Sequence, residues 1–83
     1  MRDTASNIYF IRSIAQGIHD DNPDFDKIYK KVLQKLPDNP ERGAILYECC
    51  QILQPVIAYG HFYSKLNSVF SVLLEIELRR PLT

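Results

Sequence analysis

The stretch that decides the fold runs from Gly43 to Leu74 and reads GAILYECCQILQPVIAYGHFYSKLNSVFSVLL. The whole chain carries ten basic and ten acidic residues, yet this stretch contains only Glu48 and Lys65. Because charged side chains are almost never fully buried unless they are paired, a run so poor in charge is where a core can form. We therefore expect the second half of the chain to supply most of the core and a partner-facing surface.

Apolar residues in this stretch recur three and four positions apart, which is the spacing of an amphipathic helix. The spacing predicts one helix over residues 40–59 and another from about residue 62 or 64 to residue 79. The apolar side of the first consists of Ile45, Leu46, Cys49, Ile52, Leu53, Val56 and Ile57, and that of the second consists mainly of Leu66, Val69, Phe70, Leu73 and Ile76. Pro55 lacks a backbone N–H, so we expect a kink or a local break there.

The first half of the chain predicts two further helices, from residue 4 or 6 to residue 18 and over residues 23–36. Asn22-Pro23 and Asn39-Pro40 each place a capping residue type before a proline, whose missing N–H costs nothing at the first helical position. The apolar stripe of the first helix consists of Ile8, Ile11, Ala15 and Ile18, widened by Phe10 and Ile14, and that of the second consists of Phe25, Ile28, Tyr29, Val32, Leu33 and Leu36.

Four helices joined by short loops predict an all-α protein. The sequence has no alternating β pattern, no Asn-Gly hairpin turn and no internal repeat. Short connections favour antiparallel neighbours, so we predict an antiparallel up-down four-helix bundle. We expect a single domain over residues 1–83, because dividing so short a chain would leave no core in either part.

The charge balance argues against nucleic acid as a partner. The net charge is zero, and residues 1–40 and 41–83 are each balanced, with six acidic and six basic residues in the first part and four of each in the second. No long-range field therefore attracts DNA, RNA or an anionic lipid surface. The lysine-rich face of residues 23–36 has no interleaved aromatic residues and follows an acidic run, so we interpret it as a solvated helix face.

The cysteines and the N-terminus favour a cytoplasmic location. Cys49 and Cys50 are neighbours on a predicted helix, where their side chains point about 100° apart, so they cannot form an unstrained disulfide with each other. Residues 1–7 are polar, unlike a secretory signal. Polar residues also interrupt the charge-poor stretch too often for a membrane span.

The sequence contains no motif typical of an enzyme, a cofactor site or a metal site. It shows no paired carboxylates, glycine-rich phosphate loop or Ser/His/Asp set at an interpretable spacing. The acidic run in residues 20–26 resembles the start of a calcium loop, but Phe25 and Lys31 stand where glycine and glutamate are needed, so we interpret the run as helix capping. His19 and His61 lack the spacing of zinc ligands. We therefore expect no enzymatic activity, no cofactor and no bound metal.

Aromatic residues gather around the predicted turn between the third and fourth helices. They are Tyr47, Tyr59, Phe62, Tyr63 and Phe70. Two interpretations stay open: core packing with half-buried tyrosines, or a recognition surface, since aromatic residues are enriched at protein interfaces and Lys, Glu and Asp are depleted there. For the second interpretation we predict as partner contacts Tyr59, His61, Phe62 and Tyr63.

An acidic first loop containing Asn and Pro, a lysine-rich second helix and an apolar helix-turn-helix with an aromatic turn resemble the immunity proteins of class IIa (pediocin-like, enterocin A type) bacteriocins. The resemblance covers residues 8–78, and its best local part is ILQPVIAYGHFYSKL, residues 52–66. It implies a cytoplasmic antiparallel four-helix bundle that protects a producing bacterium from its own peptide. It also implies action at the inner membrane face, on the bacteriocin-occupied mannose permease, with specificity in the C-terminal half.

Two functions from different classes follow. The first is a non-enzymatic binding protein of the immunity type, which engages a protein or peptide partner through the hairpin of the third and fourth helices. The second is a homodimeric adaptor or regulatory domain with the fourth helix as the dimer seam. The second function rests on the apolar residues of that helix, which spread around most of its circumference and include Val72, Leu74 and Leu78.

Overall fold

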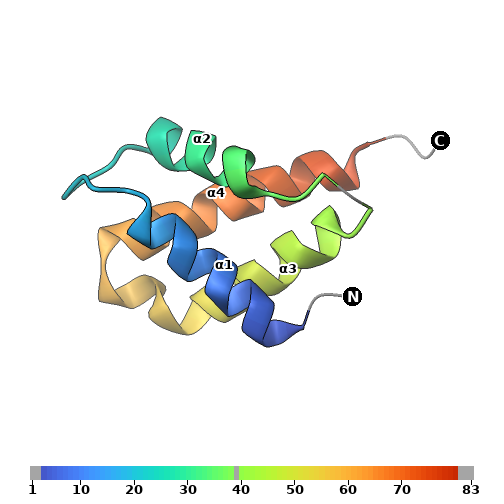
Figure 1. Cartoon of the computed structure of the whole chain (residues 1–83), viewed down its shortest axis with the longest axis horizontal. Coiled ribbons are helices and arrows are strands. Elements are labelled where there is room, and N and C mark those ends of the chain that lie inside the picture. Colours follow the sequence, from blue (N-terminus) through green and yellow to red (C-terminus); the bar gives the residue numbers. More distant parts are fainter. Residues whose placement is uncertain (1–2, 39, 81–83) are drawn as a thin grey trace.

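The chain is mostly helical within the residues that the structure describes. The computed structural model describes residues 3–38 and 40–80 (Figure 1). Its elements are α1 (Thr4–Gln16), α2 (Phe25–Lys35), α3 (Arg42–Leu53), the 3-10 helix η1 (Gln54–Tyr59) and α4 (His61–Leu78). No strand occurs within the described residues, and the predicted all-α class and antiparallel four-helix bundle are confirmed.

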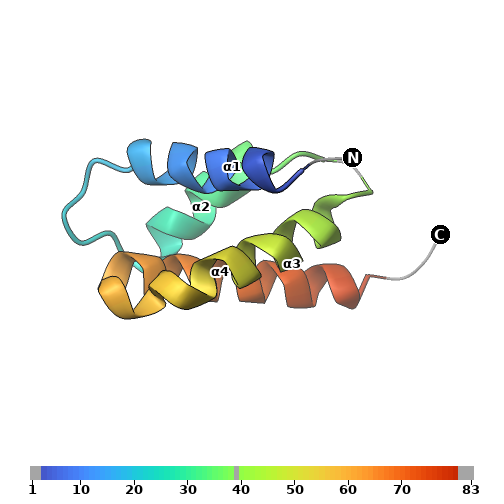
Figure 2. The same cartoon turned by 90° about the horizontal axis from the view of Figure 1, so that it is seen from below.

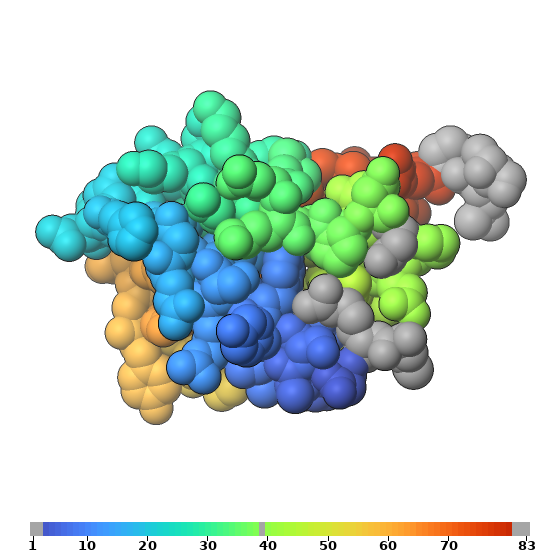
Figure 3. Space-filling view, in the orientation of Figure 1, coloured from blue at the N-terminus to red at the C-terminus, as the bar shows by residue number. Residues whose placement is uncertain are grey.

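The bundle has two layers. α3 and α4 form an antiparallel hairpin, α1 packs on α3, and α2 packs on α4 (Figures 1 and 2). In Figure 3 the side chains of α1 and α2 cover most of the face in view. Figure 2 shows α3 and α4 along the opposite side, and no helix of the described residues covers their outer face. The hairpin therefore has an inner face in the core and an outer face toward solvent.

All four helices contribute to one hydrophobic core. The buried apolar residues are Phe10, Ile11, Ile14, Ile28, Val32, Leu36, Ile45, Leu46, Cys49, Leu53, Leu66, Val69, Phe70 and Leu73. Most of the residues predicted for the apolar stripes are among these buried residues. The stripe predicted for α1 is wrong at Ile8, which is exposed, because Asn7 takes the buried position and donates a hydrogen bond to Glu48 on α3.

Near the C-terminal end of α4 a charged residue, Glu77, follows Ile76, the last residue of the predicted stripe. The carboxylate of Glu77 lies 3.7 Å from Nε of Arg42 and 3.1 Å from the guanidinium of Arg80. The side chains of Arg42 and Glu77 are both largely buried. Ile76, predicted to belong to the buried stripe, is instead exposed, because Glu77 takes the inward-facing position.

Pro55 ends the third helix. α3 stops at Leu53, and the next six residues form η1, with Pro55 in its first turn. The predicted break is confirmed, but the predicted α-helix to residue 59 is wrong in its second part. Since proline has no N–H to donate and its ring crowds the preceding turn, the chain tightens into a 3-10 turn that accepts proline at its start.

The acidic run caps a helix, as predicted, although the capping residue differs. Asp24 is the N-cap of α2, and its carboxylate accepts a hydrogen bond of 2.8 Å from the backbone N–H of Lys27. Asn22, the predicted cap, instead accepts a hydrogen bond from Lys65. The second predicted cap, Asn39, lies outside the described residues, and α3 begins at Arg42.

The two charges of the charge-poor stretch both hold the first half of the chain to the hairpin. Glu48 on α3 accepts hydrogen bonds from the side chains of Thr4 and Asn7 on α1. Lys65 on α4 donates to the side chain of Asn22 and to the carbonyl of Pro23, each at 2.9 Å. Both charges are therefore engaged in internal contacts between the two layers.

Candidate functional site

The tip of the hairpin presents two of the predicted contact residues. Tyr59 ends η1, His61 begins α4, and both are exposed. The exposed fraction of Tyr59 is 81%, the largest among the big apolar side chains of the described residues. Between η1 and α4 lies a hollow of about 310 Å³, lined by Ile57, Ala58, Tyr59, Gly60, His61 and Ser64. Tyr59 and His61 therefore share one surface, as the prediction requires.

The other two predicted contact residues lie apart from this hollow. Phe62 packs against the core and lines a separate cavity beside Ile18 and Pro23. Its ring meets that of Tyr63 edge-on, with 5.6 Å between the centroids. Tyr63 is partly exposed and does not line the hollow. Phe62 thus has the core-packing role that was the open alternative, and its ring in turn supports Tyr63.

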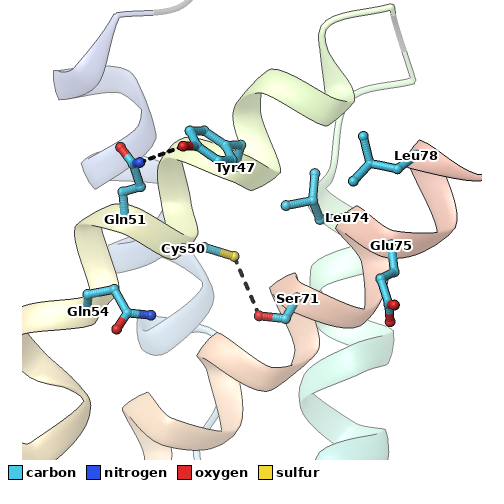
Figure 4. A pocket seen from close by; sticks show the side chains of 8 residues that line it. All are labelled: Tyr47, Cys50, Gln51, Gln54, Ser71, Leu74, Glu75 and Leu78. Carbon is cyan, nitrogen blue, oxygen red and sulfur yellow. Dashed lines mark hydrogen bonds between the residues drawn. The ribbon is translucent and has the colours of Figure 1, made fainter.

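A second surface feature lies on the outer face of the hairpin, between α3 and α4. It is a groove of about 220 Å³, and Figure 4 shows the side chains around it. Tyr47 and Leu78 stand at one end, with exposed fractions of 56% and 77%. Cys50 and Leu74 form the apolar middle of the groove, and both also pack against the core. We refer to this feature as the outer groove.

Polar side chains surround the outer groove without adding a reactive centre. They are Gln51, Gln54, Ser71 and Glu75. Gln51 donates a hydrogen bond of 2.9 Å to the hydroxyl of Tyr47 (Figure 4). Glu75 is paired with Arg79 at 3.5 Å. The groove therefore combines an apolar middle with polar edges, which suits an apolar side chain of a binding partner.

Cys50 is a partly buried free cysteine of the outer groove. Its sulfur lies 3.8 Å from the hydroxyl oxygen of Ser71. Burial raises the pKa of the Cys50 thiol above its ordinary value, and the hydrogen bond with Ser71 offsets part of this rise. Since the thiolate is the nucleophile, Cys50 lacks the lowered pKa of a catalytic cysteine.

This raised pKa predicts a loss of stability at alkaline pH. A thiol whose pKa is higher in the folded state contributes fully below its unfolded pKa, and the contribution is lost as pH rises through the folded pKa. From about pH 7 to about pH 10, across the ordinary thiol pKa, the wild type should lose stability relative to Cys50→Ser. Urea midpoints of both proteins with a reductant measure this difference. A difference that stays constant with pH contradicts the prediction.

Sequence reasoning missed the outer groove, although a signal for it was present. Residues 47, 50, 51 and 54 and residues 71, 74, 75 and 78 repeat the same helical spacing, which places each set on one helix face. The two sets meet only because α3 and α4 are antiparallel and aligned so that Tyr47 lies near Leu78. The pairing of the helices had to be known before the groove was visible.

Metal chemistry and membrane crossing have no observed support. Nowhere in residues 3–38 and 40–80 do three or more His, Cys, Asp or Glu side chains lie together as a metal site requires. Among the described helices, none combines the length and the apolar character of a membrane-crossing segment.

No family model, curated protein or solved structure matches this chain significantly. The function is therefore inferred from the residues themselves and from the resemblance of residues 8–78.

Proposed function

We propose that this protein is a non-enzymatic immunity protein, which protects a bacteriocin-producing cell by binding a protein or peptide partner through its C-terminal helical hairpin. The hairpin is α3, η1 and α4. The partner class follows from the resemblance to class IIa immunity proteins: a bacteriocin-receptor permease complex, reached from the cytoplasm at the inner membrane face. No nucleic acid, cofactor or metal is part of this proposal.

The observation that carries the proposal is the exposure of Tyr59 beside His61 at the hairpin tip. A tyrosine with most of its surface exposed contributes little to the core, whereas interfaces are enriched in Tyr. The hollow next to it is lined by apolar and small residues and by the ring of His61, and it can accept a side chain from a partner. Tyr63 stands close by in sequence, with its ring against Phe62. We expect Phe62 to act by holding Tyr63 in place.

The test uses sensitive cells that express the protein and are challenged with a broad panel of class IIa peptides. We expect the wild type to raise the inhibitory concentration of at least one peptide. Tyr59→Ala and His61→Ala should reduce this protection, because loss of an interface hot spot of about 2 kcal/mol weakens binding about 30-fold. The measurement is the concentration of each peptide that inhibits growth of cells expressing each variant, at matched expression levels.

Tyr9→Ala is the matched control. Tyr9 lies on α1 and is 75% exposed, close to the value for Tyr59, so its removal should leave protection unchanged. If cells that express the wild-type protein are as sensitive to every peptide of the panel as cells without it, the immunity function is wrong. Equal losses for Tyr9→Ala and Tyr59→Ala would show that the hairpin tip is not the contact surface.

A further inference from the structure

A cavity of about 140 Å³ lies where α2, the start of α3 and the end of α4 meet. The apolar residues of its lining are Tyr29, Leu33, Leu36, Leu46, Leu73 and Ile76. Leu46 and Leu73 are buried, whereas Leu33 and Ile76 are exposed, so the cavity has a closed floor and opens to solvent between α2 and α4. Figures 1 and 2 show the start of α3 and the end of α4 away from η1, so the cavity is remote from the hairpin tip.

Three charged residues complete the lining, and we therefore refer to this feature as the arginine cavity. They are Arg42, Glu77 and Arg80. Arg42 has a largely buried side chain, and within the described residues its Nε–H has no hydrogen-bond partner. The carboxylate of Glu77 lies 3.7 Å from this nitrogen, which is too far for a hydrogen bond. Because a buried donor without an acceptor costs the free energy of its desolvation, an acceptor from outside the chain is stabilised here.

The charges that line the arginine cavity sum to +1. Arg42 and Arg80 both face the same oxygen of Glu77, at 3.7 and 3.1 Å. Asp38 also contacts Arg42, but its side chain is almost fully exposed and does not line the cavity, so water screens its charge. A guanidinium has five N–H donors, more than these contacts with described residues use. The lining is therefore complementary to one negative charge, and a doubly charged phosphate would be repelled by Glu77.

We propose that the arginine cavity binds a carboxylate carried by a branched aliphatic group. The aliphatic group packs on Leu46 and Leu73, and the carboxylate accepts hydrogen bonds from Nε–H of Arg42 and from the guanidinium of Arg80. The cavity is smaller than the range of about 300–1,000 Å³ typical of sites for drug-sized ligands, so one aliphatic side chain with its carboxylate fills it. Such a group belongs to a free small carboxylate or to the C-terminal residue of a peptide. This binding does not depend on the immunity function.

Titration of the isotope-labelled full chain with N-acetyl-leucine, followed by NMR, tests the site. The Nε–H resonance of Arg42 and the backbone amides of Leu33 and Ile76 should shift with a Kd of about 1–10 mM, since the ligand has only about a dozen non-hydrogen atoms. N-acetyl-leucine amide lacks the charge, and acetate lacks the aliphatic group. Each should bind at least about tenfold more weakly.

Arg80→Met should weaken the binding of N-acetyl-leucine at least about fivefold, because it removes one of the two charged donors. Arg79→Met is the matched control: Arg79 is exposed, is paired with Glu75 and does not line the cavity, so this variant should bind like the wild type. The peptide acetyl-Gly-Gly-Leu separates the two sources of the carboxylate. Tighter binding than that of N-acetyl-leucine supports a peptide terminus, and equal or weaker binding supports a free small carboxylate.

Three results overturn the proposal. The first is an Nε–H resonance of Arg42 that does not move up to about 50 mM N-acetyl-leucine, well above the expected Kd. The second is equal binding of N-acetyl-leucine and its amide, which would show that the arginines do not recognise the carboxylate. The third is an equal loss of affinity in Arg79→Met and Arg80→Met, which would show a general attraction of anions to this end of α4.

Discussion

Replacing Phe70 by alanine is expected to lower the free energy of unfolding by about 3–5 kcal/mol. Phe70 lies in the middle of α4 and is fully buried. Its ring faces that of Phe10 on α1, with 6.1 Å between the centroids and a tilt of 46°. The substitution removes this contact and opens a cavity where the two layers meet. Because an 83-residue domain is stable by about 4–12 kcal/mol, the loss removes a large part of the total.

Urea unfolding at equilibrium measures this loss, provided the slope of the transition stays that of the wild type. Phe70→Leu keeps most of the volume and should cost clearly less, so a value remains measurable if Phe70→Ala does not fold. Val72→Ala is the surface control on the same helix: Val72 is 39% exposed, and its truncation should change stability by about 0.5 kcal/mol or less. A cost of Phe70→Ala no larger than that of Val72→Ala contradicts the assigned core.

Periodicity was enough to predict the helices, because each apolar stripe is a local property of the chain. Within α3 the predicted stripe is buried except for Ile52, which is partly buried against the core, and the central part of the stripe of α4 is buried as predicted. Pro55 was a reliable marker of a break for the same reason, since its effect on the backbone needs no distant partner. The stripe alone did not show that residues 54–59 form a 3-10 helix beyond this break.

The errors at Ile8 and Asn22 share one cause, namely side-chain partners distant in sequence. Ile8 looked like a core residue, yet Asn7 is buried because its partner Glu48 lies 41 residues away on α3. Asn22 looked like a cap, yet its side chain binds Lys65, 43 residues away, and Asp24 caps α2 in its place. Polar pairs of this kind have no periodic signature, so only the packed structure reveals them.

The candidate site was predictable in part. Low charge and aromatic content pointed to the hairpin tip, where Tyr59 and His61 share one surface. The same signal could not separate Phe62, which packs on the core, from its exposed neighbours, because low charge and aromatic content do not show which side of the helix faces the core. The outer groove needed the alignment of α3 with α4, which places Tyr47 near Leu78.

Replacing Glu48 by alanine should lower the free energy of unfolding by about 1.5–3 kcal/mol. Glu48 accepts hydrogen bonds from the buried amide of Asn7 and from the hydroxyl of Thr4, and thus joins α1 to α3. Removing its carboxylate takes the acceptor away from a buried donor, which costs the desolvation of that donor as well as the bond. The measurement is the urea midpoint of the variant against the wild type.

The control variants separate charge from hydrogen bonding. Glu48→Gln keeps an acceptor oxygen and loses the charge, so its cost should be about half that of Glu48→Ala, since a charge-assisted hydrogen bond is roughly twice as strong as a neutral one. A double-mutant cycle with Asn7→Ala should give a coupling of at least about 1 kcal/mol. If the two single changes simply add, Glu48 and Asn7 do not form the bond that joins the layers. Of the two contacts that Glu48 makes with α1, the hydrogen bond from Thr4 would then be the one that holds the layers together.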